Sequence, residues 1–234
     1  MPDVGKNHSR GLSRLRSFLK TSFPPPTLTR LRNTRIFDWM NLHAPGRRVL
    51  NLGSGLGGFD YLLHPSVEMV AMDICPSKPN LDVVGDAHRL PFKNGSFDIV
   101  YSIAVLEHVA KPWIVADEIF RILKPGGFVV LELPFLNVIH DAHDYFRFTD
   151  LGIRSLFDRF VVVFEQVSAG GGSFLSIFSV EYFAQFIPGE VFRKCLKRIF
   201  LYFSVVFKFL DVFIDSSPNL RITANSFSFI GQKK

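Results

Sequence analysis

From residue 48 onward, hydrophobic residues come in short runs of strand length, and these runs alternate with stretches of helical periodicity. The runs that predict strands are 48–52, 67–72, 81–84, 97–101 and 127–133. The clearest helical pattern between them covers residues 113–123. Because strands that alternate with helices are joined by crossover connections, this pattern predicts a parallel sheet with helices on both faces.

A segment rich in phenylalanine separates two further strand patterns, at 160–168 and 224–231. Between them we expect a helical insert at about 173–217, within the same domain as the strands. With 47% hydrophobic and 21% charged residues, the composition is that of a folded domain with a full core, which excludes a disordered chain. Two cysteines are too few for a disulfide framework, which favours a reducing compartment.

Positive charge is concentrated at the beginning of the chain. The net charge is +6, but ten of the 27 Lys and Arg residues, and only two of the 21 acidic residues, lie in residues 1–48. The remainder is slightly acidic, so the basic balance does not indicate nucleic-acid binding. We expect residues 1–34 to form a basic, flexible leader, either a solvated tail or a targeting segment, and residues 35–234 to form the domain.

A glycine-rich turn follows the first predicted strand, with Gly53, Gly55, Gly57 and Gly58. Glycines in such a turn permit positive φ and let a ligand lie directly against backbone N–H groups. Asp73 ends the second strand, where a carboxylate can accept hydrogen bonds from both hydroxyls of a ribose. The spacing predicts a nucleoside cofactor, and it satisfies the dinucleotide pattern G-x-G-x-x-G as well.

Two later motifs narrow the choice between a dinucleotide and another nucleoside cofactor. Residues 86–92 read D-A-x-x-L-P-F after the third strand, and residues 123–127 read L-K-P-G-G. In this order and spacing, the motifs resemble those of the class I S-adenosylmethionine-dependent methyltransferases over about residues 48–134. The resemblance implies an α/β fold, a Rossmann-like three-layer α/β/α sandwich whose mostly parallel seven-stranded sheet ends in antiparallel strands. It also implies S-adenosyl-L-methionine as the cofactor.

The same resemblance assigns a cofactor site by position. The residues that it implies are Asn51, Gly53, Ser54, Gly55, Gly57, Asp73, Ile74, Asp86, Ala87 and Ser102. Asp73 would bind the ribose and Asp86 the amino group of adenine, while Ser102 would line the methionine end. Asn51 departs from the family, which often has an acid there, so one charge that organises the cofactor is missing.

The loop after the fifth predicted strand, residues 135–149, is the densest polar and aromatic cluster of the chain. It resembles an H-D-Y-x-R-F-T signature of methyltransferases associated with cell-surface glycan and lipid biosynthesis. Since an acceptor must enter at this edge of a parallel sheet, we interpret His143 as a general base and Tyr145 and Arg147 as acceptor-binding residues. His140 is the second candidate for the base.

Two other interpretations of this loop remain open. In the first, an Arg147–Asp144 ion pair and stacked rings only hold the loop together. In the second, His140-x-x-His143-Asp144 binds a metal, but no other ligand is evident, so we assign no metal. Glu107 and His108 are interpreted as helix and packing residues.

The insert contains a basic and apolar stretch at residues 190–214. Its basic residues are spaced four apart as Arg193/Lys197 and Lys194/Arg198, and a run rich in phenylalanine follows them. Lys208 and Asp211 make the run too polar for an independent membrane span. A helix that lies on an anionic lipid surface and a helix that covers the sheet or a dimer face are both compatible with this pattern.

Together these features predict an enzyme that methylates a small or lipid-linked acceptor, with O-methylation in glycan or lipid metabolism as the main expectation. The alternatives are a lipid-quinone-type C-methyltransferase and an inactive S-adenosylmethionine-binding regulator. No nucleic-acid partner is expected, because residues 101–104 do not form an N-P-P-Y-like tetrapeptide. We expect a cytoplasmic protein with peripheral membrane contact through residues 190–214, while the sequence sets no oligomeric state.

Overall fold

The structure is a computed structural model that describes residues 29–55, 63–77, 81–214 and 217–234. The predicted Gly57 and most of the predicted leader therefore lie outside the described residues. The first described element is helix α2 (Thr29–His43), so the expected boundary after residue 34 falls inside a helix.

Seven strands form a single mixed sheet in the order β3-β2-β1-β4-β5-β7-β6. Their bounds are β1 (Arg48–Leu52), β2 (Glu68–Asp73), β3 (Val83–Val84), β4 (Phe97–Ile103), β5 (Leu123–Pro134), β6 (Phe160–Ala169) and β7 (Ser226–Lys233). Strands β1 to β5 pair in parallel, and β7 runs antiparallel to both β5 and β6. The predicted seven-stranded sheet with antiparallel last strands is confirmed.

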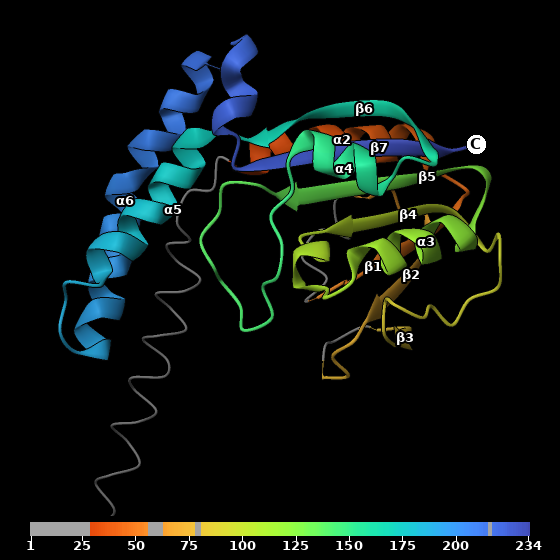
Figure 1. Cartoon of the computed structure of the whole chain (residues 1–234), viewed down its shortest axis with the longest axis horizontal. Helices are drawn as coiled ribbons and strands as arrows, with labels where there is room; N and C mark the ends of the chain where they lie inside the picture. The colour runs from red at the N-terminus through yellow and green to blue at the C-terminus, as the bar shows by residue number, and fades with distance from the viewer. Residues whose placement is uncertain (1–28, 56–62, 78–80, 215–216) are drawn as a thin grey trace, which may run out of the picture.

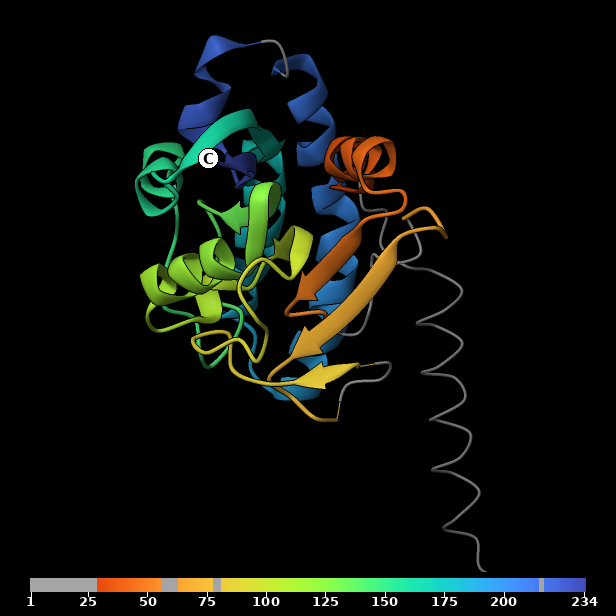
Figure 2. The same cartoon turned by 90° about the vertical axis from the view of Figure 1, so that its right-hand side faces the viewer.

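Helices cover both faces of this sheet (Figures 1 and 2). Helix α2 packs on one face, while α3 (Pro112–Ile122) and α4 (Asp150–Leu156) pack on the other. Side chains of successive strand residues point to opposite faces, so in β1 Val49 joins the core beneath α2, whereas Leu50 and Leu52 join the core beneath α3 and α4. The near-continuous apolar runs of the sequence follow from this burial on both faces.

Helix α4 begins at an N-cap formed by a threonine side chain. The Thr149 hydroxyl accepts a hydrogen bond from the backbone N–H of Gly152 at 3.0 Å. This bond satisfies one of the N–H groups that a helix start leaves without a partner. The cap also fixes where the loop that leaves β5 must end.

The insert forms a hairpin of two helices, α5 (Gly171–Ala184) and α6 (Glu190–Ile214), which extends away from the sheet (Figure 1). At Gly172 a Cβ atom would lie 1.9 Å from the carbonyl oxygen of Phe207, so only glycine permits this close approach of the two helices. The buried Asp211 carboxylate accepts hydrogen bonds from the N–H groups of Gly172 at 2.8 Å and Ser173 at 3.2 Å. Asp211 of α6 therefore caps the first turn of α5.

The hairpin leaves the sheet and returns to it at one place. Strand β6 ends at Ala169, which pairs with Ser226 at the start of β7, and the N–H of Asn225 bonds the Ala169 carbonyl at 2.7 Å. The short helix η3 (Pro218–Thr223) completes the return. Because β6 runs in the same direction as β5, this point lies at the carboxyl edge of the parallel strands.

Much of the hairpin surface is apolar. Phe213 is 84% exposed and Phe186 is 71% exposed, and several other aromatic and aliphatic side chains beside them are also exposed. Among the described residues, no helix combines the length and the apolar character that crossing a membrane would require.

Candidate functional site

A tight glycine turn forms the first wall of the site, where β1 ends. The N–H groups of Gly53 and Ser54 both donate to the Met72 carbonyl, at 2.8 and 3.0 Å, and thereby tie the turn to β2. Gly53 has φ +74°, and a Cβ atom there would lie 2.4 Å from Val105 Cγ2. Backbone conformation and lack of space both require glycine at this position.

Asp73 lies at the end of β2 with a fixed carboxylate. Its Oδ2 accepts a hydrogen bond from Gly55 N–H at 2.8 Å, and its Oδ1 accepts one from Cys75 N–H at 2.9 Å. A carboxylate has about four acceptor positions, so about two remain for ligand hydroxyl groups. The next residue, Ile74, is 69% exposed and offers an apolar surface beside that carboxylate.

The turn after β3 forms the next wall. The Asp86 carboxylate accepts hydrogen bonds from the His88 backbone N–H at 2.9 Å and contacts His88 Nδ1 at 2.7 Å. The backbone hydrogen bond from His88 contributes most to lowering the pKa of Asp86, so this carboxylate stays charged. A Cβ atom at Gly85 would lie 2.7 Å from Met72 Cε, so the end of that methionine packs directly against the turn.

These walls enclose a cleft of about 540 Å³ at the carboxyl edge of the sheet. The predicted site residues that line it are Gly53, Gly55, Asp73, Ile74, Asp86, Ala87 and His143. The volume is in the range of small-molecule sites, and the position is where open α/β sheets bind ligands. The glycine turn, the Asp73 carboxylate and the apolar Ile74 suit a nucleoside with a ribose and an adenine ring.

Three predicted cofactor residues lie beneath this cleft and do not line it. Ser102 is fully buried, and its hydroxyl donates to the Leu52 carbonyl at 3.1 Å. Asn51 is buried in β1, and Ser54 contributes its backbone N–H to the turn. Ser102 and Ser54 thus help to hold the glycine turn through these hydrogen bonds. Contact of all three residues with a cofactor stays a prediction.

Sequence reasoning missed the wall that follows β4. This wall consists of Ala104, Val105, His108 and Val109, with Asp141 opposite. Ala104 has φ +53°, a left-handed conformation that costs free energy in a residue other than glycine. Its position directly after a parallel strand was the available signal, since loops at that edge line the ligand site.

The loop after β5 folds back over the short helix η2 (Leu106–His108). The N–H groups of Tyr145 and Phe146 donate to the Glu107 carbonyl at 2.7 and 3.3 Å. Further along the loop, the N–H of Phe148 donates to the Pro134 carbonyl at 2.8 Å. This course brings His143 to the cleft, with its ring 6.4 Å from that of Tyr145. Tyr145 itself is half exposed and does not line the cleft.

Arg147 directs its guanidinium into its own loop. It forms a bidentate ion pair with Asp144, and its other N–H groups donate to the carbonyls of Asn137, Val138 and Phe146. All five N–H donors of the side chain are thereby used. The hydrogen bonds from Arg147 hold the pKa of Asp144 far below its usual range. Arg147 thus holds the loop in place, and its predicted contact with an acceptor stays a prediction.

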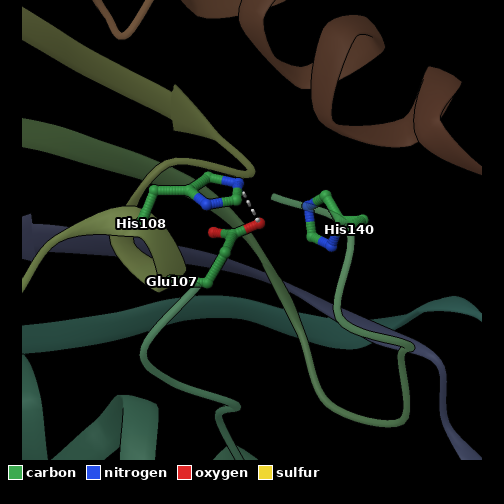
Figure 3. A group of neighbouring side chains, drawn as sticks. All are labelled: Glu107, His108 and His140. Carbon is green, nitrogen blue, oxygen red and sulfur yellow. Dashed lines mark ion pairs between the residues drawn. The ribbon is translucent and has the colours of Figure 1, made fainter. Parts of the chain in front are cut away.

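A buried carboxylate lies beside two imidazoles at the point where this loop meets η2 (Figure 3). Glu107 is fully buried, and neither of its carboxylate oxygens has a hydrogen-bond partner among the described residues. Its Oε1 lies 3.8 Å from His108 Nε2. Burial raises the pKa of Glu107, against smaller opposing effects of nearby groups that include the Arg147 guanidinium. Glu107 and His108 lie in the short helix η2, and their role as helix and packing residues stays a prediction.

Comparisons with known proteins agree with this arrangement. A family model described as a methyltransferase domain matches residues 50–131. An uncharacterized methyltransferase of Mycobacterium tuberculosis is 33% identical over 108 residues, which cover 40% of this chain and 42% of that protein. The 2-methyl-6-phytyl-1,4-hydroquinone methyltransferase of Synechocystis sp. is 32% identical over 101 residues, 37% of this chain and 32% of that protein. The chain thus matches less than half the length of either relative.

Solved structures share the fold at low sequence identity. A putative methyltransferase in complex with the Haloferax volcanii Trm112 activator has a TM-score of 0.56 at 17% identity, covering 98% of this chain and 97% of that one. A Haemonchus contortus phosphoethanolamine N-methyltransferase, solved with S-adenosylhomocysteine and phosphomonomethylethanolamine, has a TM-score of 0.53 at 17% identity, covering 87% of this chain and 52% of that one. These matches confirm the Rossmann-like fold.

Proposed function

We propose that this chain, which carries a class I methyltransferase domain at residues 50–131, transfers a methyl group from S-adenosylmethionine to a small or lipid-linked acceptor. The observation that carries this proposal is the cleft where the glycine turn, Asp73 and the turn at Asp86 meet. S-adenosylmethionine supplies a methyl group activated by a positively charged sulfur. Transfer then requires alignment of the acceptor with that group and removal of the acceptor's proton.

The residues of the cleft have distinct roles in this proposal. The free acceptor positions of the Asp73 carboxylate bind the ribose hydroxyls, since its other positions are held by Gly55 and Cys75. Ile74 packs against the adenine, and the turn at Asp86 and Ala87 binds the edge of that ring. The methionine part lies over the glycine turn, where Gly53 keeps the backbone accessible.

His143 is the general base of the proposed reaction, because it is the predicted catalytic residue that lines the cleft. If the acceptor is a hydroxyl, its proton leaves during attack, and a neutral imidazole is suited to accept it near neutral pH. The acceptor enters from the side of the loop after β5, where Asp141 also borders the cleft. O-methylation in glycan or lipid metabolism is therefore the main candidate function.

A lipid-quinone-type C-methylation is the second candidate. The observation that favours it is the 32% identity with the Synechocystis hydroquinone methyltransferase. Incubating the protein with tritium-labelled S-adenosylmethionine and separate glycolipid and quinone extracts distinguishes the two candidates by the fraction that takes up label. Label in neither fraction, together with tight cofactor binding, would contradict both lipid candidates and leave a small acceptor or an inactive cofactor-binding regulator.

The chain should bind S-adenosylmethionine and S-adenosylhomocysteine, whereas NAD should not compete for the site. The reason is that the cleft combines the glycine turn, Asp73 and the turn at Asp86 and Ala87, the set that the resemblance to methyltransferases assigns to S-adenosylmethionine. Titration calorimetry with each cofactor, followed by displacement with NAD, measures this selectivity. Displacement of S-adenosylhomocysteine by NAD at comparable concentration would contradict the assignment.

The α5–α6 hairpin contacts an anionic lipid surface in this proposal. Phe186, at the turn between the two helices, and Phe213, at the end of α6, are exposed and supply apolar contact. Exposed Arg193 and Lys194 at the start of α6 supply positive charge. Because the hairpin leaves the sheet at the carboxyl edge, such contact places the cleft near the lipid. Peripheral contact of this kind also suits a lipid-linked acceptor.

Flotation with phosphatidylglycerol vesicles should carry the protein to the lipid fraction at low salt and less so at high salt. Changing Phe213 to Ser, or Arg193 and Lys194 to Gln, should weaken flotation. Leu151→Ser and the Lys93/Lys111→Gln pair remove comparable exposed groups elsewhere and should leave it unchanged. If the protein stays with the soluble fraction at low salt, the hairpin serves packing or association between protein chains instead.

A further inference from the structure

Three side chains with metal-binding atoms meet at the wall of the cleft. Glu107, His108 and His140 each offer one ligand atom, and these atoms lie within 4.8 Å of one another (Figure 3). Glu107 and His108 come from η2, whereas His140 comes from the loop after β5. The backbone bonds from Tyr145 and Phe146 to the Glu107 carbonyl bring the two segments together.

The hydrogen bond of His108 leaves its metal-binding nitrogen free. Its Nδ1 lies 2.6 Å from the carbonyl oxygen of His143. Because a carbonyl oxygen only accepts hydrogen bonds, Nδ1 carries the proton, and Nε2 of the neutral ring keeps its lone pair. Nε2 is also the nitrogen that faces Glu107, at 3.8 Å from Oε1.

His140 is oriented in the same way. Its Nδ1 lies 3.2 Å from the Val138 carbonyl and 3.2 Å from Asp144 Oδ2, and both groups are acceptors. The proton therefore stays on Nδ1 and leaves Nε2 as the ligand atom. Histidines that bind metals commonly donate their other N–H to a carbonyl or a carboxylate, and both histidines of this cluster have such a partner.

Glu107 provides the independent reason to expect a cation. Its side chain is fully buried, and both oxygens are without hydrogen-bond partners among the described residues. A buried carboxylate without hydrogen-bond partners is costly, and a cation bound by its oxygens would reduce that cost. An ion at this position would face two neutral imidazole nitrogens and one carboxylate.

We propose that Glu107, His108 and His140 form a binding site for a divalent first-row transition metal such as Zn²⁺. Two imidazole nitrogens and one carboxylate oxygen suit Zn²⁺, Fe²⁺ or Co²⁺, whereas Mg²⁺ and Ca²⁺ prefer oxygen ligands alone. Bonds of about 2.0–2.1 Å in tetrahedral geometry bring ligand atoms to about 3.3 Å from one another. Since they lie within 4.8 Å here, the exposed His140 and its loop move inward when the ion binds.

The ion borders the cleft because His108 lines it. A fourth coordination position that faces the cleft is open to water or to an oxygen of the acceptor. A divalent ion lowers the pKa of a bound oxygen, so it would favour loss of the acceptor's proton. This role rests on the proposed methyl transfer, whereas the binding site itself does not.

Cobalt binding tests the site without any assay of activity. The untagged protein is freed of metal with a chelator and titrated with Co²⁺, whose visible absorption reports its ligands, and Zn²⁺ is then added as a competitor. We expect one equivalent to bind and to be displaced by Zn²⁺. Glu107→Gln and His140→Ala should each weaken binding by about 100-fold or more. His64→Ala removes an exposed histidine that lies elsewhere in the chain, and it should bind as the unaltered protein does.

His140→Ala decides the outcome if Glu107→Gln does not fold, because His140 is exposed and its loss leaves no buried gap. Absence of Co²⁺ and Zn²⁺ binding at micromolar concentration, or unchanged binding by His140→Ala, would overturn the proposal. Calorimetry with S-adenosylmethionine on the same samples separates the two hypotheses. Metal binding without cofactor binding refutes the proposed function alone, and cofactor binding without metal binding refutes the metal site alone.

Discussion

Replacing His143 by alanine should lower the turnover of methyl transfer by about 10²–10⁴-fold, which is the usual contribution of a positioned base. Affinity for S-adenosylmethionine should hardly change, because Asp73 and the glycine turn lie on other strands. The fold should persist too, since the bond that His143 makes to His108 comes from its backbone carbonyl, which alanine retains. Single-turnover kinetics with saturating cofactor measures the effect on the chemical step.

His64→Ala is the matched control for this experiment, because it removes an exposed histidine that does not line the cleft. A merely structural role of His143 predicts a different result, in which the melting temperature, cofactor affinity and turnover fall together. Turnover of His143→Ala at the rate of the unaltered protein would remove this histidine from the mechanism. Alignment of the acceptor would then remain as the source of catalysis.

Replacing Asp73 by alanine should weaken S-adenosylmethionine binding by about 10–150-fold, from the loss of about 1.5–3 kcal/mol in charged hydrogen bonds. Two effects contribute to this loss. The ribose hydroxyls lose their acceptor, and the N–H groups of Gly55 and Cys75 lose the carboxylate that holds the turn. Titration calorimetry gives the affinity, and thermal unfolding shows whether the fold is retained.

Asp82→Ala provides the matched control for Asp73. Like Asp73, Asp82 has a carboxylate that accepts a backbone hydrogen bond: the Ala71 N–H of β2 donates to Asp82 Oδ2 at 2.8 Å. Unlike Asp73, Asp82 does not line the cleft. This variant should lose a comparable amount of stability and keep its cofactor affinity. Equal affinity of Asp73→Ala and the unaltered protein would refute the assignment of this carboxylate to the ribose.

The strands of the sheet were predictable because each is marked by an apolar run within its own short stretch of sequence. Buried parallel strands are apolar on both faces, so β1 is predicted to the residue and β4 to within two residues. The apolar edge strand β6 is predicted to within one residue. The largest difference is at β5, which begins at Leu123, four residues before the predicted start. The Lys-Pro-Gly-Gly stretch contains turn residues, yet Leu123 already pairs with Phe97 across an irregularity in the register.

The cofactor side of the cleft was predictable for a similar reason. Gly53 and Asp73 follow directly on strands, and their residue types carry the signal for positive φ and for a ribose acceptor. Ser102 shows the limit of assignment by position. It lies on β4 at the expected edge, but its hydroxyl is bonded to the Leu52 carbonyl beneath the turn.

The acceptor side was less predictable, because it depends on contacts between distant segments. His140 follows Glu107 by 33 residues, and only the fold of the loop over η2 brings them together. The sequence Leu-Glu-His-Val gives no sign that the glutamate is fully buried and has no hydrogen-bond partner within the described part of the chain. Arg147 likewise has the residue type of an acceptor-binding group, yet its five donors are used within the loop.

The pairing of Ala169 with Ser226 means that residues 170–225 are, topologically, one long connection between two neighbouring antiparallel strands. Chain insertions between closely spaced ends cost the host sheet little, because loop entropy rises slowly with length. The α5–α6 hairpin can therefore be shortened, lengthened or exchanged while the register of β6 and β7 is kept. One sheet can in this way carry different hairpins, each attached at a single junction.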